Sequence, residues 1–130
     1  MTVRTAACCC SQLRITCEGE PIRISMCHCL ECQRRTGSTY GVQARWPTVR
    51  TAVEGHAAEY VRIGDEGNRI TFRFCPYCGS TVYWTLSGVP DAVAVAAGAF
   101  ADPALPPPTV SVYDSRRHPW VSVPDGVQRL

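Results

Sequence analysis

Residues 26–37, MCHCLECQRRTG, place three thiols close together, at Cys27, Cys29 and Cys32. The alternation of apolar and polar residues just before this stretch predicts a strand. The two-residue period of that strand puts Cys27 and Cys29 on the same, polar side, and Cys32 follows across a turn. Thiolates are good ligands for zinc, and three protein ligands leave one tetrahedral position free, as in a catalytic site. We therefore predict a three-cysteine zinc site that can bind one further ligand.

A second pair of thiols, Cys75 and Cys78, lies in the sequence FCPYCGS. This spacing is typical of half of a zinc knuckle, and also of a redox-active dithiol. A redox dithiol needs a helix that starts at the first cysteine, and Pro76 and Gly79 argue against such a helix. We therefore interpret the pair as metal ligands.

Cys8 and Cys10 are the expected partners of this pair, because the period of a strand places both on one face. The four thiols would form a closed four-cysteine site, which is the structural type of zinc site and would join the N-terminus to the middle of a sheet. Spacing alone leaves a competing assignment open, a single site built from Cys27, Cys29, Cys75 and Cys78.

The remaining cysteines and the histidines are expected to have structural roles. Cys9 and Cys17 stand among apolar residues, and a buried free cysteine is common in a protein core. His28 follows the apolar side of its strand, so we expect it to be packed beside the ligands rather than to be one. His56 and His118 have no partner at a ligand spacing.

The composition indicates one folded domain, residues 1–130, with 45% hydrophobic and 18% charged residues. A net charge of +2 without a basic stripe argues against a nucleic-acid partner. The longest apolar run, residues 92–101, covers about half of a membrane span, and the N-terminus has no apolar stretch typical of a secretion signal. We expect a cytoplasmic protein without a membrane partner, whose cysteines are reduced and free to bind metal.

Short stretches of alternating apolar and polar residues, bounded by turn signals, predict an all-β fold of folded-over sheets. Residues 64–68 are a strong hairpin signal. Residues 30–36 are expected to form one short helical turn closed by Gly37. The expected strands are a pair within residues 3–17 with its turn near Ser11, and further strands at 21–26, 40–46, 59–63, 70–74, 82–86, 92–100 and 110–113.

Three motifs of the chain resemble those of the glutathione-dependent formaldehyde-activating enzyme family, which includes centromere protein V. The motifs are CHCLECQRRTG, FCPYCGS and SRRHPWVSVPDG, and the resemblance extends from Cys8 to Gly126 and is greatest to the short members. It implies an Mss4-like antiparallel β fold with two zinc sites. It also implies that the structural zinc is held by Cys8, Cys10, Cys75 and Cys78, and the catalytic zinc by Cys27, Cys29 and Cys32.

The activity that this resemblance implies is that of a zinc-dependent carbon–sulfur lyase. Such an enzyme condenses glutathione, or a similar small thiol, with formaldehyde to S-hydroxymethylglutathione. A thiol at the open zinc position would lose its proton and attack the aldehyde carbon as a thiolate. The alternative is a non-catalytic, zinc-stabilised module that carries glutathione or binds a protein.

Arginines close to these motifs are expected to bind the carboxylates of glutathione. Arg34 and Arg35 directly follow the third cysteine of the catalytic motif, and Arg116 belongs to the C-terminal motif. All thirteen basic residues are arginines, and the planar guanidinium group suits bidentate binding of carboxylates. Exposed apolar strands would support a homodimer.

Overall fold

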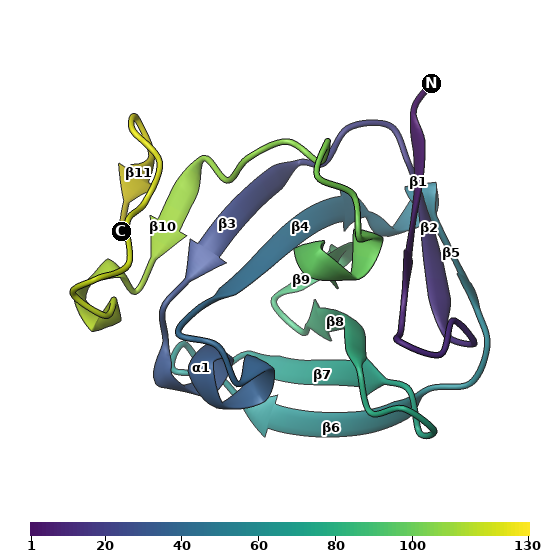
Figure 1. Ribbon diagram of the computed structural model, residues 1–130. Coiled ribbons are helices and arrows are strands. Elements are labelled where there is room, and N and C mark those ends of the chain that lie inside the picture. Colours follow the sequence, from purple (N-terminus) through teal and green to yellow (C-terminus); the bar gives the residue numbers. More distant parts are fainter.

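The alternating stretches of the sequence form eleven strands in the computed structural model, which describes residues 1–130 (Figure 1). One α-helix and three short 3-10 helices connect them. In chain order the elements are β1 (Val3–Ala7), β2 (Arg14–Glu18), β3 (Arg23–Cys27), α1 (Leu30–Thr36), β4 (Gly41–Pro47), η1 (Thr48–Arg50), β5 (Thr51–Glu54), β6 (Ala58–Ile63), β7 (Arg69–Phe74), β8 (Thr81–Leu86), β9 (Val89–Ala96), η2 (Ala97–Phe100), β10 (Val110–Val112), η3 (Asp114–Arg116) and β11 (Gln128–Arg129).

The strands belong to two sheets. The smaller sheet has the order β1-β2-β5, and the larger has the order β11-β10-β3-β4-β9-β8-β7-β6. Figure 1 shows that the larger sheet is strongly bent, so that β6 and β7 run across the lower edge while β3 and β4 rise on the left. The helix α1 lies in the bend, where β3 ends and near one end of β7. This all-β architecture with one short helix confirms the predicted fold class.

The core lies between the smaller sheet and one face of the larger one. The alternation of residues in and just before β2 predicts that Leu13, Ile15 and Cys17 share one face, and all three are completely buried. They pack in one cluster with Trp46 of β4. The indole nitrogen of Trp46 donates a hydrogen bond of 3.0 Å to the carbonyl oxygen of Gly19, which satisfies the one polar atom of this side chain.

The segment that follows β1 corrects two expectations about the first cysteines. The strand ends at Ala7, so Cys8 and Cys10 lie in the turn of a hairpin and not on one face of a strand. Cys9 is exposed, whereas we expected it in the core. The physical reason is the turn itself, in which Ser11 has a φ of +69° and the two-residue alternation of a strand no longer applies.

The predicted helix is confirmed at both ends. Cys29 is the N-cap residue of α1, and its sulfur accepts a hydrogen bond of 3.2 Å from the backbone nitrogen of Cys32. Gly37 ends the helix with a φ of +69°, a left-handed conformation that glycine adopts without strain.

The predicted strand 92–100 is shorter than expected at its C-terminal end. Strand β9 occupies the middle of the larger sheet, between β4 and β8, but it ends at Ala96, and residues 97–100 form η2. The sequence also contained no indication that β10 would pair in parallel with β3. In that pairing Val112 lies beside Cys27, so the C-terminal segment runs next to the three-cysteine motif.

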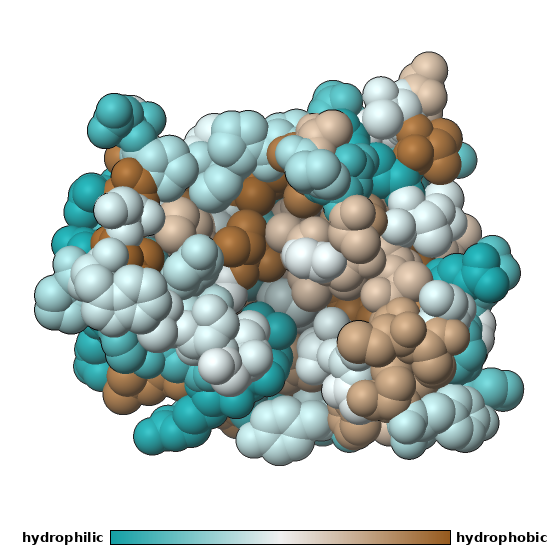
Figure 2. Space-filling view, in the orientation of Figure 1, coloured by the Kyte–Doolittle hydropathy of each residue, from teal (hydrophilic) through white to brown (hydrophobic).

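Large hydrophobic side chains are exposed at several separate places, including Val49 at 93%, Tyr77 at 73% and Trp120 at 72%. On the face shown in Figure 2, hydrophobic side chains are interspersed with hydrophilic ones. The homodimer therefore stays a prediction.

No helix of the chain has the length and apolar character that a membrane span requires.

Candidate metal centres and the adjoining cavity

The three-cysteine motif folds into a compact group of thiols. The sulfur atoms of Cys27, Cys29 and Cys32 all lie within 4.8 Å of one another. Cys27 is the last residue of β3, Cys29 caps α1, and Cys32 lies in the first turn of that helix. Cys27 and Cys32 are buried and Cys29 is half-buried. The junction between strand and helix therefore brings the three ligand atoms together.

The three thiols lie close enough together to affect one another's protonation. Bonds from Cys27 and Cys32 lower the pKa of Cys29 to about 2, and the bond between Cys27 and Cys29 raises the pKa of Cys27. The backbone nitrogen of Cys32 also donates to the Cys29 sulfur. Such donors stabilise negative charge on sulfur, which is the form in which cysteine binds a metal.

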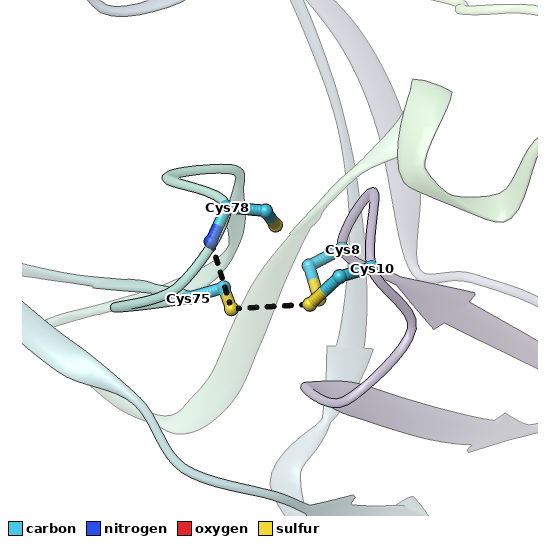
Figure 3. A group of neighbouring side chains, drawn as sticks. All are labelled: Cys8, Cys10, Cys75 and Cys78. Carbon is cyan, nitrogen blue, oxygen red and sulfur yellow. Dashed lines mark hydrogen bonds between the residues drawn. The ribbon is translucent and has the colours of Figure 1, made fainter.

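A second, separate group of thiols consists of Cys8, Cys10, Cys75 and Cys78 (Figure 3). The sulfur of Cys10 lies 3.6 Å from that of Cys8 and 3.6 Å from that of Cys75. All four sulfur atoms, with Cys78, lie within 4.8 Å of one another. A tetrahedral zinc with zinc–sulfur bonds of about 2.3 Å separates its ligands by about 3.8 Å, so this donor set fits the ion closely.

Hydrogen bonds to the sulfur atoms of this second group also favour the thiolate form that binds a metal. Gln12 donates to the sulfur of Cys75 over 3.0 Å, and the backbone nitrogen of Leu13 donates to that of Cys8 over 3.3 Å. The hydroxyl of Ser80 lowers the pKa of Cys78 to about 5. Donors around the ligands are the usual surroundings of a thiolate zinc site.

The grouping of the sulfur atoms distinguishes the two assignments that spacing left open. Seven cysteines divide into four and three, and Cys27 and Cys29 do not share a group with Cys75 and Cys78. Cys9 belongs to neither group. Cys17 is buried in the core, and burial raises its pKa to about 12, so that it remains a thiol.

A cavity of about 410 Å³ adjoins the three-cysteine group. Its lining includes all three of these cysteines, the aromatic rings of Phe72 and Trp84, and the hairpin between β6 and β7. Basic residues outnumber acidic ones in the lining, because Glu31, Asp65 and Glu66 face five arginines, namely Arg23, Arg34, Arg35, Arg62 and Arg116. The three arginines expected from the sequence are thus brought to the same cavity as the three thiols.

These arginines differ in how they are held. Arg34 is exposed and forms an ion pair of 3.1 Å with Glu31. The guanidinium carbon of Arg35 lies 4.4 Å from the ring centre of Trp84, and that of Arg62 lies 5.6 Å from the ring centre of Phe72. Neither Arg35 nor Arg62 has an acidic partner, so both charges remain available to an anion.

Sequence reasoning missed Arg23 and Arg62. Arg62 stands opposite Ile70 in the hairpin of β6 and β7, and residues opposite each other in a sheet share a face. The predicted hairpin therefore contained the signal that Arg62 and Ile70 face the same way. That this face would turn toward α1 depends on the bend of the whole sheet.

His28 is completely buried, as expected, and lies outside both groups of ligands. Its Nε2 atom is 3.0 Å from the hydroxyl oxygen of Ser111. Burial lowers its pKa, so that the ring is neutral near pH 7. His118 instead bonds to the side chain of Gln33 over 2.9 Å, which ties the C-terminal segment to α1.

Comparison with known proteins identifies the family of the chain. A family profile described as "Glutathione-dependent formaldehyde-activating enzyme" matches residues 3–116. The chain belongs to this family, which confirms the resemblance seen in its motifs. A crystal structure of a Rhodobacter sphaeroides protein is similar with a TM-score of 0.57 and 20% identity, over 73% of this chain and 85% of that one. At this identity the similarity supports the fold alone. A search of curated proteins finds no match.

Proposed function

We propose that the three-cysteine group holds a zinc ion with one open position, and that the chain there adds glutathione, or a similar small thiol, to formaldehyde. The product is S-hydroxymethylglutathione, and the activity is that of a carbon–sulfur lyase. One observation carries the proposal: three clustered thiols line a cavity that also contains arginines without acidic partners. Membership of a family named for this chemistry agrees with it.

The two groups of thiols are assigned different roles. Cys8, Cys10, Cys75 and Cys78 hold the structural ion, because four thiolates fill a tetrahedral site. Cys27, Cys29 and Cys32 hold the second ion and leave room for a ligand from the cavity. Zinc bound there supplies positive charge that stabilises a substrate thiolate at neutral pH.

The arginines are proposed to bind and orient the substrate. Glutathione has two carboxylates, and Arg35 and Arg62 present charges that no acid of the chain neutralises. Arg116 is a third candidate, whereas Arg34 is less suited because of its ion pair with Glu31. Charge-assisted bonds of this kind are among the strongest that a protein makes to a carboxylate. They would hold the substrate so that its sulfur faces the cysteines.

The test is the zinc content of freshly purified protein, measured again during titration with glutathione. We expect two zinc ions per chain, with one of them perturbed or released as glutathione is added. Replacement by cobalt would show the same event as a change in the absorption of one site only. One zinc ion that does not respond to glutathione would contradict the proposal and leave a protein with a structural four-cysteine site alone.

A second candidate function is a carrier of glutathione without catalysis. The observation that favours it is that no histidine lines the cavity and that Glu31 is engaged by Arg34, which leaves Asp65 and Glu66 of the β6–β7 hairpin as its other acids. The usual proton-transfer groups are therefore few. Because glutathione adds to formaldehyde without a catalyst, the decisive measurement is the rate above this background. A rate equal to the background, together with binding of glutathione, would favour the carrier.

A further inference from the structure

Tyr113 has an unusual backbone conformation, with φ of +50° and ψ of +42°. This left-handed region is uncommon for a residue with a side chain and rare for a bulky one. Such a conformation persists only where the surrounding structure enforces it, and it is found preferentially at functional sites. The contacts that hold the backbone at Tyr113, and the position of its side chain, can therefore indicate a functional role.

Residues on both sides of Tyr113 are held firmly. Val112 pairs with Cys27 across the parallel strands β10 and β3, and its carbonyl oxygen accepts a bond of 3.1 Å from the nitrogen of His28. On the other side, Asp114 accepts a bond of 2.8 Å from the hydroxyl of Ser111. The chain therefore leaves the strand directly beside the three-cysteine motif and must turn at Tyr113.

This turn brings the side chain of Tyr113 into the lining of the cavity, together with Cys27 and Cys29. The residue is exposed, with 40% of its surface accessible to solvent. Its hydroxyl makes no hydrogen bond within the chain. The group is therefore free to bond to a molecule in the cavity.

The hydroxyl is also in the correct protonation state to be a donor. Burial, and then the negative charges of Asp65 and Glu66, raise the pKa of Tyr113 above its ordinary value, which is about 10. The phenol therefore keeps its proton at neutral pH. No histidine lines the cavity, and of its three acidic residues Glu31 is paired with Arg34, while Asp65 and Glu66 lie in the hairpin between β6 and β7.

We propose that the Tyr113 hydroxyl donates a proton to the aldehyde oxygen when the thiolate attacks the aldehyde carbon, an inference that rests on the proposed function. A sulfur electron pair forms the carbon–sulfur bond, and the π pair of the carbonyl moves to the oxygen. The proton of Tyr113 passes to that oxygen, which becomes the hydroxyl of the product. The phenolate then takes a proton from water. The transfer is favourable because an alkoxide is a stronger base than a phenolate.

The test is the Tyr113→Phe variant, studied with both zinc sites occupied. The substitution removes the hydroxyl and keeps the ring. We expect kcat above the uncatalysed background to fall about 100-fold, which is the scale of a lost proton donor. KM for glutathione and the zinc content should stay unchanged, because the donor acts in the transition state. The matched control is Tyr60→Phe, since Tyr60 is 57% exposed and does not line the cavity.

Three results would overturn the inference. An unchanged kcat in Tyr113→Phe would exclude the proton donor and leave the proposed function intact. A fall in zinc content or in melting temperature that accompanies the loss of rate would make Tyr113 a structural residue. A wild-type rate equal to the background would overturn the proposed catalysis itself, and the role of Tyr113 with it.

Discussion

The Nε2 atom of His28 lies 3.0 Å from the hydroxyl oxygen of Ser111, and both side chains are completely buried. Ser111 donates its only proton to Asp114, over 2.8 Å. The hydroxyl oxygen must therefore accept from His28, which places the proton of the neutral ring on Nε2. Since His28 stands between Cys27 and Cys29, this chain of bonds ties the three-cysteine group to the C-terminal segment.

Replacement of Ser111 by alanine should weaken both the fold and this group of ligands. The change leaves the Nε2 proton of His28 buried without an acceptor, which costs about 1–3 kcal/mol in free energy of unfolding. We expect this loss in urea unfolding, together with faster release of one zinc ion to a chelator. The control is Ser38→Ala, at an exposed serine near the end of α1. Equal stability and zinc retention in Ser111→Ala would contradict the argument.

Loss of single ligands should separate the two metal centres. In Cys32→Ser we expect one zinc ion to be lost while the chain stays folded, because β3 and α1 remain packed in the sheet. In Cys75→Ser we expect loss of the other ion and a much lower melting temperature. Cys75 is completely buried, and its site connects the β1–β2 hairpin to the turn after β7.

Zinc analysis and thermal unfolding of both variants measure this difference. Cys9→Ser is the matched control, since Cys9 is exposed and belongs to neither group. It should keep both zinc ions and the melting temperature of the wild type. If Cys32→Ser unfolds as completely as Cys75→Ser, the division into a structural and a functional site is wrong.

Removal of Arg62 should weaken binding of glutathione without slowing the chemical step. The side chain of Arg62 lines the cavity and has no acidic partner, so it is available to a substrate carboxylate. For Arg62→Gln we expect KM to rise about tenfold with an unchanged kcat, as for lost uniform binding. The effect should shrink at high salt. Arg69→Gln, at an exposed position that does not line the cavity, should bind normally. Equal KM values for the two variants would exclude Arg62 as a substrate ligand.

Asp114 should stabilise the fold in a pH-dependent manner. The hydrogen bond from Ser111, and then the charge of Arg129, hold the pKa of Asp114 below its ordinary value, which is about 3.9 in the unfolded chain. A depressed pKa in the folded state means that the stabilisation is complete above about pH 4 and is lost as the pH falls through the folded pKa.

The measurement is the melting temperature of wild type and Asp114→Asn between neutral and acidic pH. The variant should be less stable at pH 7, and the difference should narrow below about pH 4. Comparing the two proteins at each pH cancels the loss of zinc, which acid causes in both. A difference that is constant over the whole range would show that the charge of Asp114 does not contribute.

Local patterns predicted most of the secondary structure correctly, for reasons that are visible in particular residues. The alternation of Leu13, Ile15 and Cys17 predicted a strand with one buried face, and all three are buried. Gly37 predicted the end of α1 because a left-handed residue must follow the helix there. Cys9 was misplaced because a tight turn replaces the strand, and the period of two ends with the strand.

The sequence by itself determined the family of this protein, since cysteine spacing and three motifs indicated that family and the two groups of thiols. Ligands close in sequence are brought together by a single turn. Only the tertiary structure decided what faces the three-cysteine group. Arg62 and Tyr113 reach the cavity because the larger sheet bends around α1 and because β10 pairs with β3. Such contacts join residues far apart in the chain, and no local pattern encodes them.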